Sequence, residues 1–318
     1  MNKMSAKKYL TVFFISSAIS AVMFLAGCGF FHKKIYARLY FPDKTNQLLI
    51  PITEQVAKLT PQILMSQLEK GEPNQTHLLP LFPDRMGFPQ VSTNGSAIYV
   101  DFKTSPPAEK APLLIPGILA TFQQLPQYKT VLFSVNGNTE TLGEGGVELG
   151  KFSLRHFWIN DNLELTPFPL MNGEYQKTII YLELRKSHYL VPVTIRLPGN
   201  IPIEKAAAAA LTVSPHQMGW LLKSPLPPGF KILSISNPAD KTITMVVHAA
   251  GTAREERAAR RALALTFCGI PGVKYVRIQP EAGIFGWRPL QKMPKFVNIL
   301  IRDNPYIDSR KEREWGIK

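Results

Sequence analysis

The residues of this chain that could carry out acid–base or metal chemistry are scattered, and no two of them form a recognised pair. The six histidines are never three or four residues apart and occupy positions His32, His77, His156, His188, His216 and His248. A zinc site or an acid–base pair needs such groups close together. Asp101 ends an apolar run without a paired carboxylate, so we interpret it as a turn or cap residue. The sequence therefore predicts no catalytic residue, no metal site and no cofactor.

Two further segments have ordinary structural interpretations. The glycines between Gly137 and Gly146 lack a phosphate-binding lysine and a strand-to-helix setting, so a turn-rich hairpin is favoured over a phosphate loop. Cys268 has no histidine near it in sequence, which favours a small apolar residue beside a helix end over a reactive thiol. Cys268 and Cys28 are the two cysteines of the chain, and no intramolecular disulfide framework is expected.

Cys28 is the one position with a specific chemical signature. It follows a positive start and an uncharged apolar run over residues 9–24, and it closes the sequence Leu25-Ala26-Gly27-Cys28. This order is typical of a secretory signal. The last four residues resemble the bacterial lipobox, in which the thiol accepts a diacylglyceryl group and the cysteine becomes the new amino terminus. A transmembrane anchor needs about 20 apolar residues, and this run is shorter.

We therefore predict a lipoprotein signal peptide over residues 1–27, lipid on Cys28 and a short lipidated tether over 28–34. The mature protein is expected on the extracytoplasmic face of the cell membrane. Its charge is uneven, because residues 35–150 hold 8 basic and 10 acidic side chains whereas residues 177–283 hold 14 and 6. The basic second half could face anionic lipid, wall polymer or an acidic protein. Export and the lack of a recognition motif argue against nucleic acid.

The two halves of the mature chain repeat one pattern. Leu49-Ile50-Pro51-Ile52-Thr53 corresponds to Leu190-Val191-Pro192-Val193-Thr194, and Pro61 corresponds to Pro202, both at an offset of 141 residues. Leu125-Pro126 and Ile270-Pro271 match at an offset of 145. A repeated unit of this length indicates two similar domains.

Each half contains the same order of predicted elements. In the first half we expect strands near 35–41, 47–52, 89–93, 96–102 and 130–135, with helices over 61–70 and 110–124. In the second half we expect strands near 177–184, 188–196, 230–236, 241–248 and 273–278, with helices over 202–213 and after Thr252. Thr60 is a predicted N-cap, and Thr252 with Glu255 forms a predicted capping box.

These elements predict an α+β fold of two similar small domains, each a mixed β-sheet with two helices packed on one face. The predicted first domain covers 35–150 and the second covers 177–283. Residues 151–176 form an inter-domain segment whose Phe157, Trp158 and Phe168 favour packing against a domain. Residues 284–318 form a basic carboxy-terminal extension, in which Phe296 to Ile301 could add a strand; its end is interpreted as a solvated tail or a docking surface.

The Tyr-Phe strand, the Leu-Ile-Pro-Ile-Thr segment, the helix ending at Gly71-Glu72-Pro73 and Ile98-Tyr99-Val100-Asp101-Phe102 together resemble the GerM domain family. The resemblance covers roughly 35–142 and 177–283. The chain departs from the family pattern at Glu54, where a basic residue is common, and at Val246-Val247-His248.

The resemblance implies a role in sporulation and spore germination. It also implies a fold similar to the ring-building modules of secretion systems, and an association with the channel complex that joins mother cell and forespore. We accordingly expect a non-enzymatic scaffold with envelope or sporulation proteins as partners, and possible homo-oligomers. The alternative from the residues is an envelope enzyme or a ligand-binding lipoprotein that acts on cell-wall polymer.

Overall fold

The computed structural model describes residues 34–71, 78–82, 87–106, 111–139, 149–155, 157–161, 175–212, 219–281, 290–294 and 297–298. Cys28, the predicted signal peptide and the tether before Lys34 lie outside these residues. From Tyr36 onward the contacts group the chain into one compact unit. Within the described residues, no helix has the length and apolar character needed to span a membrane.

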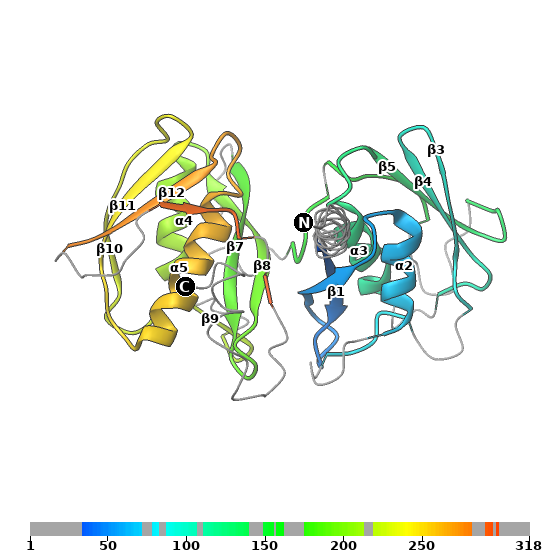
Figure 1. The fold of residues 1–318 in the computed structure, drawn as a ribbon, viewed down its shortest axis with the longest axis horizontal. Coiled ribbons are helices and arrows are strands. Elements are labelled where there is room, and N and C mark those ends of the chain that lie inside the picture. The colour runs from blue at the N-terminus through cyan, green and yellow to red at the C-terminus, as the bar shows by residue number, and fades with distance from the viewer. Residues whose placement is uncertain are drawn as a thin grey trace, which may run out of the picture. The chain divides into compact units, whose positions relative to one another are not determined.

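In its described residues, the first domain contains two helices and six strands, which Figure 1 shows. In chain order they are β1 (Ile35–Pro42), β2 (Leu49–Val56), α2 (Pro61–Glu69), β3 (Gln90–Asn94), β4 (Ala97–Phe102), α3 (Ala111–Phe122), β5 (Thr130–Val135) and β6 (Gly150–Ser153).

The second domain repeats this order with one additional short strand. Its elements are β7 (Tyr175–Leu184), β8 (Leu190–Pro198), α4 (Ile203–Thr212), β9 (Leu222–Lys223), β10 (Lys231–Ile235), β11 (Thr242–His248), α5 (Ala253–Phe267), β12 (Tyr275–Pro280) and β13 (Leu290–Lys292).

The strands of each domain divide into two sheets. The larger sheet has the order β3-β4-β5-β6 in the first domain and β10-β11-β12-β13 in the second. In both, the two central strands are parallel and the outer strands are antiparallel to them. The smaller sheet is β1-β2 in the first domain and β8-β7-β9 in the second. The predicted α+β class and the mixed sheet are confirmed, but the opening hairpin of each domain forms a sheet of its own.

The helices of each domain lie between its two sheets, as Figure 1 shows for α4 and α5. This position explains the sequence of α3, where Leu114, Ile118 and Phe122 are fully buried. A helix that is covered on more than one side has an apolar stripe wider than that of a surface helix. The larger sheet presents alternate residues to the same core, such as Ile98 and Val100.

Two equivalent hydrogen bonds confirm the internal repeat. The hydroxyl of Thr121 in α3 accepts the N–H of Tyr40 at 3.3 Å, and the hydroxyl of Thr266 in α5 accepts the N–H of Tyr181 at 3.1 Å. Both threonines are completely buried. These bonds link the second helix of each domain to the outer edge of its opening hairpin, and they follow the offsets of 141 and 145 seen in the sequence.

The predicted helix starts are confirmed. The Thr60 hydroxyl accepts the N–H of Ile63, and the Thr252 hydroxyl accepts the N–H of Glu255 while Glu255 accepts the N–H of Thr252. The hairpin turn between β3 and β4 lies one residue later than predicted, at Gly95–Ser96, because Asn94 still pairs with Ala97. Gly95 has φ +55, which glycine adopts without the steric cost of a Cβ.

Three short strands were not predicted, namely β6, β9 and β13. Each has only two to four residues, too few for a period-2 pattern to show. The predicted strand over Phe296 to Ile301 is wrong at Val297 and Asn298, which form a bend; its other residues lie outside the described part of the chain. The strand of the extension is β13 instead.

Candidate functional site: the strands that join the two domains

The two Leu-x-Pro-x-Thr segments form strands β2 and β8, and these strands approach each other. Strand β2 pairs through one edge with β1, and β8 pairs through one edge with β7. A proline has no N–H, so Pro51 and Pro192 cannot complete a ladder, although their carbonyl oxygens remain acceptors. The outer edges of β2 and β8 therefore need hydrogen-bond donors and acceptors from other segments of the chain.

Asn160 supplies the first set of these groups. Its Oδ1 accepts the N–H of Leu49 at 2.9 Å, and its Nδ2 donates to the carbonyl of Leu49 at 3.0 Å and to that of Pro192 at 2.7 Å. Because a backbone N–H can only donate, the side-chain atom that faces it must be the amide oxygen. One amide thus binds the backbones of both domains.

Asn298 does the same from the other side. Its Oδ1 accepts the N–H of Leu190 at 2.9 Å, and its Nδ2 donates to the carbonyl of Leu190 at 2.9 Å and to that of Pro51 at 2.8 Å. Leu49 and Leu190 are equivalent in the repeat, as are Pro51 and Pro192. The contact therefore has approximate two-fold symmetry at the level of single hydrogen bonds.

The threonines of the repeated segment complete the contact. Thr53 N–H donates to the Asn298 carbonyl at 3.0 Å, and the Thr53 hydroxyl accepts the Val297 N–H at 3.0 Å. In the second domain, the N–H and the hydroxyl of Thr194 both donate to the Ile159 carbonyl, at 3.0 and 2.7 Å. We call the two segments Ile159–Asn160 and Val297–Asn298, with their bonds to β2 and β8, the asparagine clasp.

The apolar residue of each clasp segment is buried. Ile159 is 3% exposed and Val297 is 1% exposed. Val297 joins the core of the second domain, where it packs against Tyr181, Leu190, Ala262 and Leu265. The clasp therefore combines buried apolar area with hydrogen bonds that satisfy strand edges.

Tyr40 and Tyr181, another pair related by the repeat, are both buried. Burial raises the pKa of each phenol, and Tyr181 raises the pKa of Tyr40 further. The effect of Tyr181 on Tyr40 is that of two phenols near each other.

Each clasp segment follows the last strand of its own domain. Ile159–Asn160 comes after β6, and Val297–Asn298 comes after β13. Sequence reasoning missed both asparagines, although a signal existed: an Ile-Asn pair and a Val-Asn pair lie 138 residues apart (298 − 160), close to the main repeat offset of 141. The repeated unit is therefore longer than the matching strands and helices alone indicate.

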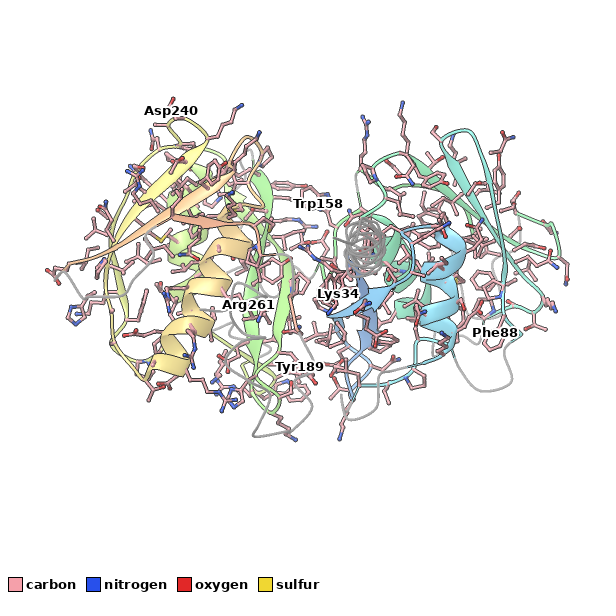
Figure 2. The ribbon with its side chains drawn as sticks, viewed as in Figure 1. Lys34, Phe88, Trp158, Tyr189, Asp240 and Arg261 are labelled. Carbon is pink, nitrogen blue, oxygen red and sulfur yellow. The ribbon has the colours of Figure 1, made fainter. Side chains whose placement is uncertain are left out.

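The inter-domain segment is also bound to the second domain by charge. Asp161 accepts from Lys177 at 2.7 Å and lies 3.7 Å from Arg196. The Lys177 ammonium lies 5.7 Å from the ring centroid of Trp158, which Figure 2 labels. Of the aromatic residues for which packing was predicted, Trp158 contacts Lys177 but stays 36% exposed, and Phe168 lies outside the described residues.

The first residues of the carboxy-terminal extension are likewise bound. Strand β13 completes the second large sheet, with Lys292 5.7 Å from the ring centroid of Tyr275. Arg38 of strand β1 donates from Nη2 to the carbonyl of Pro294 at 3.1 Å. Residues 290–294 and 297–298 therefore belong to the folded unit, and the predicted tail or docking surface further on lies outside the described residues.

The other candidate residues have structural roles. Asp101 accepts from the hydroxyl of Ser134 at 2.6 Å and from the N–H of Gly137 at 2.8 Å, which confirms its interpretation as a turn residue. His248 is an exposed residue 3.2 Å from Glu281. His32, His77, His156 and His216 lie outside the described residues. Among the residues described, no group of three His, Cys, Asp or Glu side chains is placed to hold a metal ion.

Cys268 ends helix α5 and is half-buried, with its thiol 3.6 Å from the carbonyl of Lys274. Burial raises the pKa of this thiol to about 11. We therefore expect slow alkylation at neutral pH, because a shift from 9.0 to about 11 leaves about a hundredfold less thiolate. The measurement is the iodoacetamide rate against pH, with Cys268→Ser as the control. A rate that levels off below pH 9 would contradict the prediction.

The comparisons with known proteins agree with this geometry. Residues 38–141 match the Germane family model, described as sporulation and spore germination. The structure is similar to the tandem GerMN domains of the sporulation protein GerM from Bacillus subtilis, with a TM-score of 0.64 and 19% identity over 84% of this chain and 99% of that one. At this identity the likeness concerns the fold. No curated protein matches the chain.

A second solved structure, a putative lipoprotein from Clostridium perfringens, is 18% identical over 36% of this chain and 83% of that one. Its TM-score of 0.23 is too low to support an argument about fold. The fold defines a class, that of proteins with two tandem GerM-like domains. The chain is GerM-type in fold, and its residues 38–141 match the Germane family of sporulation and spore germination.

Proposed function

We propose that this chain is a lipid-anchored, non-enzymatic scaffold of sporulation and spore germination, which assembles with an envelope complex or a channel complex between mother cell and forespore. The match of residues 38–141 to the Germane family supports the biological process. The asparagine clasp supports the scaffold part of the proposal. Asn160 and Asn298, which occupy similar positions in the two repeated units, bond the two domains to each other.

The clasp also limits how partners bind. The outer edges of strands β2 and β8 are occupied by the clasp segments, so β-strand addition must use other edges. Strands β3 and β10 each lie at one end of a larger sheet. Strand β10 carries exposed Leu233 and a register shift between Ile232 and Ser234, which discourages unspecific pairing of an edge. Strand β3 has a regular register and is the better candidate edge for a protein partner.

The test of the scaffold role is crosslinking in sporulating cells, followed by identification of the captured molecules. We expect specific envelope or sporulation proteins to be recovered with the intact chain. Recovery of peptidoglycan fragments without a protein partner would contradict the scaffold role and favour a protein that acts on wall polymer.

The lipid anchor is tested separately by Cys28→Ala. Without the thiol no diacylglyceryl group can be attached, so the protein should leave the membrane fraction or stay as an unprocessed precursor. Cell fractionation and the mass of the mature amino terminus report this outcome, with Cys268→Ser as a matched control that keeps Cys28. Normal processing and membrane localisation of the Cys28→Ala protein would refute the anchor.

A further inference from the structure

The tip of the β7–β8 hairpin and the loop before β9 bring an exposed tryptophan among basic side chains. Trp220 is 60% exposed, whereas Leu221 and Leu222, which follow it, are buried. Arg185 and Lys186, at the hairpin tip, are exposed. Burial of a tryptophan side chain is strongly favourable. The exposure of Trp220 beside two buried leucines therefore indicates a function for the exposed ring.

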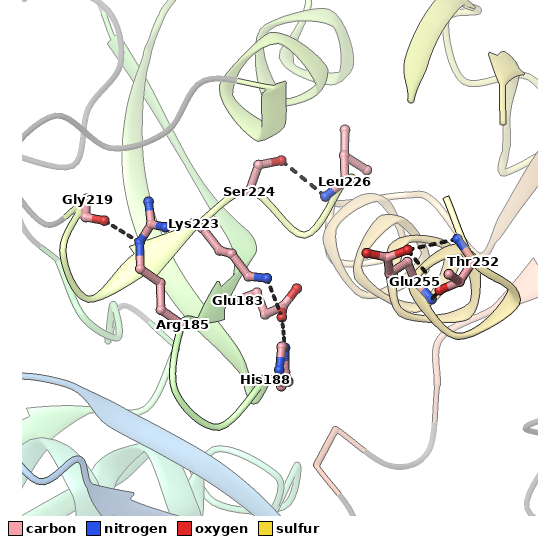
Figure 3. A network of polar contacts seen from close by, with 9 residues as sticks. All are labelled: Glu183, Arg185, His188, Gly219, Lys223, Ser224, Leu226, Thr252 and Glu255. Carbon is pink, nitrogen blue, oxygen red and sulfur yellow. Dashed lines mark hydrogen bonds and ion pairs between the residues drawn. The ribbon is translucent and has the colours of Figure 1, made fainter. Parts of the chain in front are cut away.

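The two loops are held together firmly. Arg185 donates its backbone N–H to the carbonyl of Leu221 at 3.0 Å, and its Nε donates to the carbonyl of Gly219, as Figure 3 shows. Strand β9 then pairs with the end of β7 through Glu183 and Leu184. Trp220 is therefore displayed on a loop fixed on both sides.

The tip has an excess of positive charge. Among the described residues, the Glu183 carboxylate is mostly buried and already engaged by Lys223 at 3.0 Å and by His188 (Figure 3). Arg185 and Lys186 add two more positive charges. Counting histidine as uncharged, Arg185, Lys186 and Lys223 exceed the carboxylates of Glu183 and Glu255, which also interacts with Lys223, and leave a net charge of +1 near Trp220.

We propose that this tip is a contact site for an anionic phospholipid surface. An indole ring lies favourably at the boundary between headgroups and acyl chains, and basic side chains are attracted to the negative surface potential of anionic lipid. The opposite charge of the two surfaces favours this occupant over a neutral one. The proposal deepens the proposed function, since a lipid on Cys28 would keep the chain beside such a surface.

The test reconstitutes the full lipidated chain in vesicles of phosphatidylcholine alone or mixed with phosphatidylglycerol, each with brominated lipid that quenches nearby tryptophan fluorescence. The difference between the unmodified protein and Trp220→Phe isolates the signal of Trp220. Trp158→Phe is the matched control, because Trp158 is 36% exposed and lies against Lys177.

We expect Trp220 to be quenched in the anionic vesicles and much less in the neutral ones. Lys186→Glu, which reverses one tip charge, should reduce the quenching by about half or more, because each basic residue near an anionic surface changes partitioning several-fold. Lys58→Glu, at an exposed lysine of the first domain, should leave it unchanged.

Equal quenching of Trp220 in both kinds of vesicle, or none in either, would overturn the proposal. This outcome is distinguishable from a failure of the lipid anchor, because a chain without lipid would not float with neutral vesicles at all. A floating protein whose Trp220 is not quenched contradicts the contact site alone.

Discussion

Replacing Asn298 by aspartate is expected to lower the free energy of unfolding by about 3–5 kcal/mol, since a buried group would lose its donors and gain charge. The Asn298 side chain donates to the carbonyls of Pro51 and Leu190 at 2.8 and 2.9 Å, and the residue is 6% exposed. A carboxylate would place an oxygen where the Nδ2 atom faces these two carbonyl oxygens. Chemical denaturation of the full chain, followed by circular dichroism, measures the loss.

Asn160→Asp is the matched variant, because the clasp gives Asn160 the same three bonds with the domains exchanged. We expect a smaller loss than for Asn298→Asp, because Asn160 is only half-buried and water can solvate the new carboxylate. Combining Asn160→Ala with Asn298→Ala should cost an amount different from the sum of the single changes, since both side chains stabilise one contact. Losses below about 1 kcal/mol for both aspartate variants, well under the usual cost of an unsatisfied buried group, would show that the clasp does not hold the domains together.

Asp43→Ala is expected to destabilise the protein by about 3 kcal/mol, because the buried carboxylate organises the turn between β1 and β2. Its Oδ1 accepts the N–H groups of Gln47 and Leu48, both at 2.8 Å, and its Oδ2 accepts the N–H of Thr45 at 3.0 Å. Alanine leaves these donors without a partner in a turn that fixes the start of β2. The midpoint of urea unfolding reports the change.

Asp43→Asn should cost less than Asp43→Ala, because an amide keeps one acceptor oxygen for the N–H groups of Gln47 and Leu48. Lys44→Ala changes an exposed neighbour in the same turn and should stay within about 0.5 kcal/mol of the unmodified protein. An Asp43→Ala protein as stable as Lys44→Ala would show that the turn forms without its carboxylate.

The elements of the fold were largely predictable from local patterns. Alternation identified β4 and β5, and capping residues identified the starts of α2 and α5, because these signals depend on neighbours in sequence. The short strands β6, β9 and β13 were not predictable, since two to four residues become a strand only when another strand lies beside them. The same limit applies to the division of each domain into two sheets.

Only part of the candidate site, the repeated strands, was predictable from the sequence. The repeated Leu-x-Pro-x-Thr segments were visible in the sequence. Their role in joining the domains was not, because the groups that bond to a strand edge are known only from the tertiary structure. Asn160 and Asn298 are ordinary polar residues in sequence, in segments that were interpreted as a linker and an extension. Their roles depend on a contact between residues more than a hundred positions apart, such as Asn160 with Leu49.

The Leu-Ala-Gly-Cys28 sequence by itself predicts a lipoprotein, and the internal offset by itself predicted two similar domains. Both are properties of short patterns that act through local chemistry or repetition. Only the tertiary structure decided how the two domains are joined. The carbonyl oxygens of Pro192 and Pro51 accept hydrogen bonds from Asn160 and Asn298, which lie at the far ends of the repeated units. Buried backbone groups must find partners, and which partners they find is settled by the packing of the whole chain.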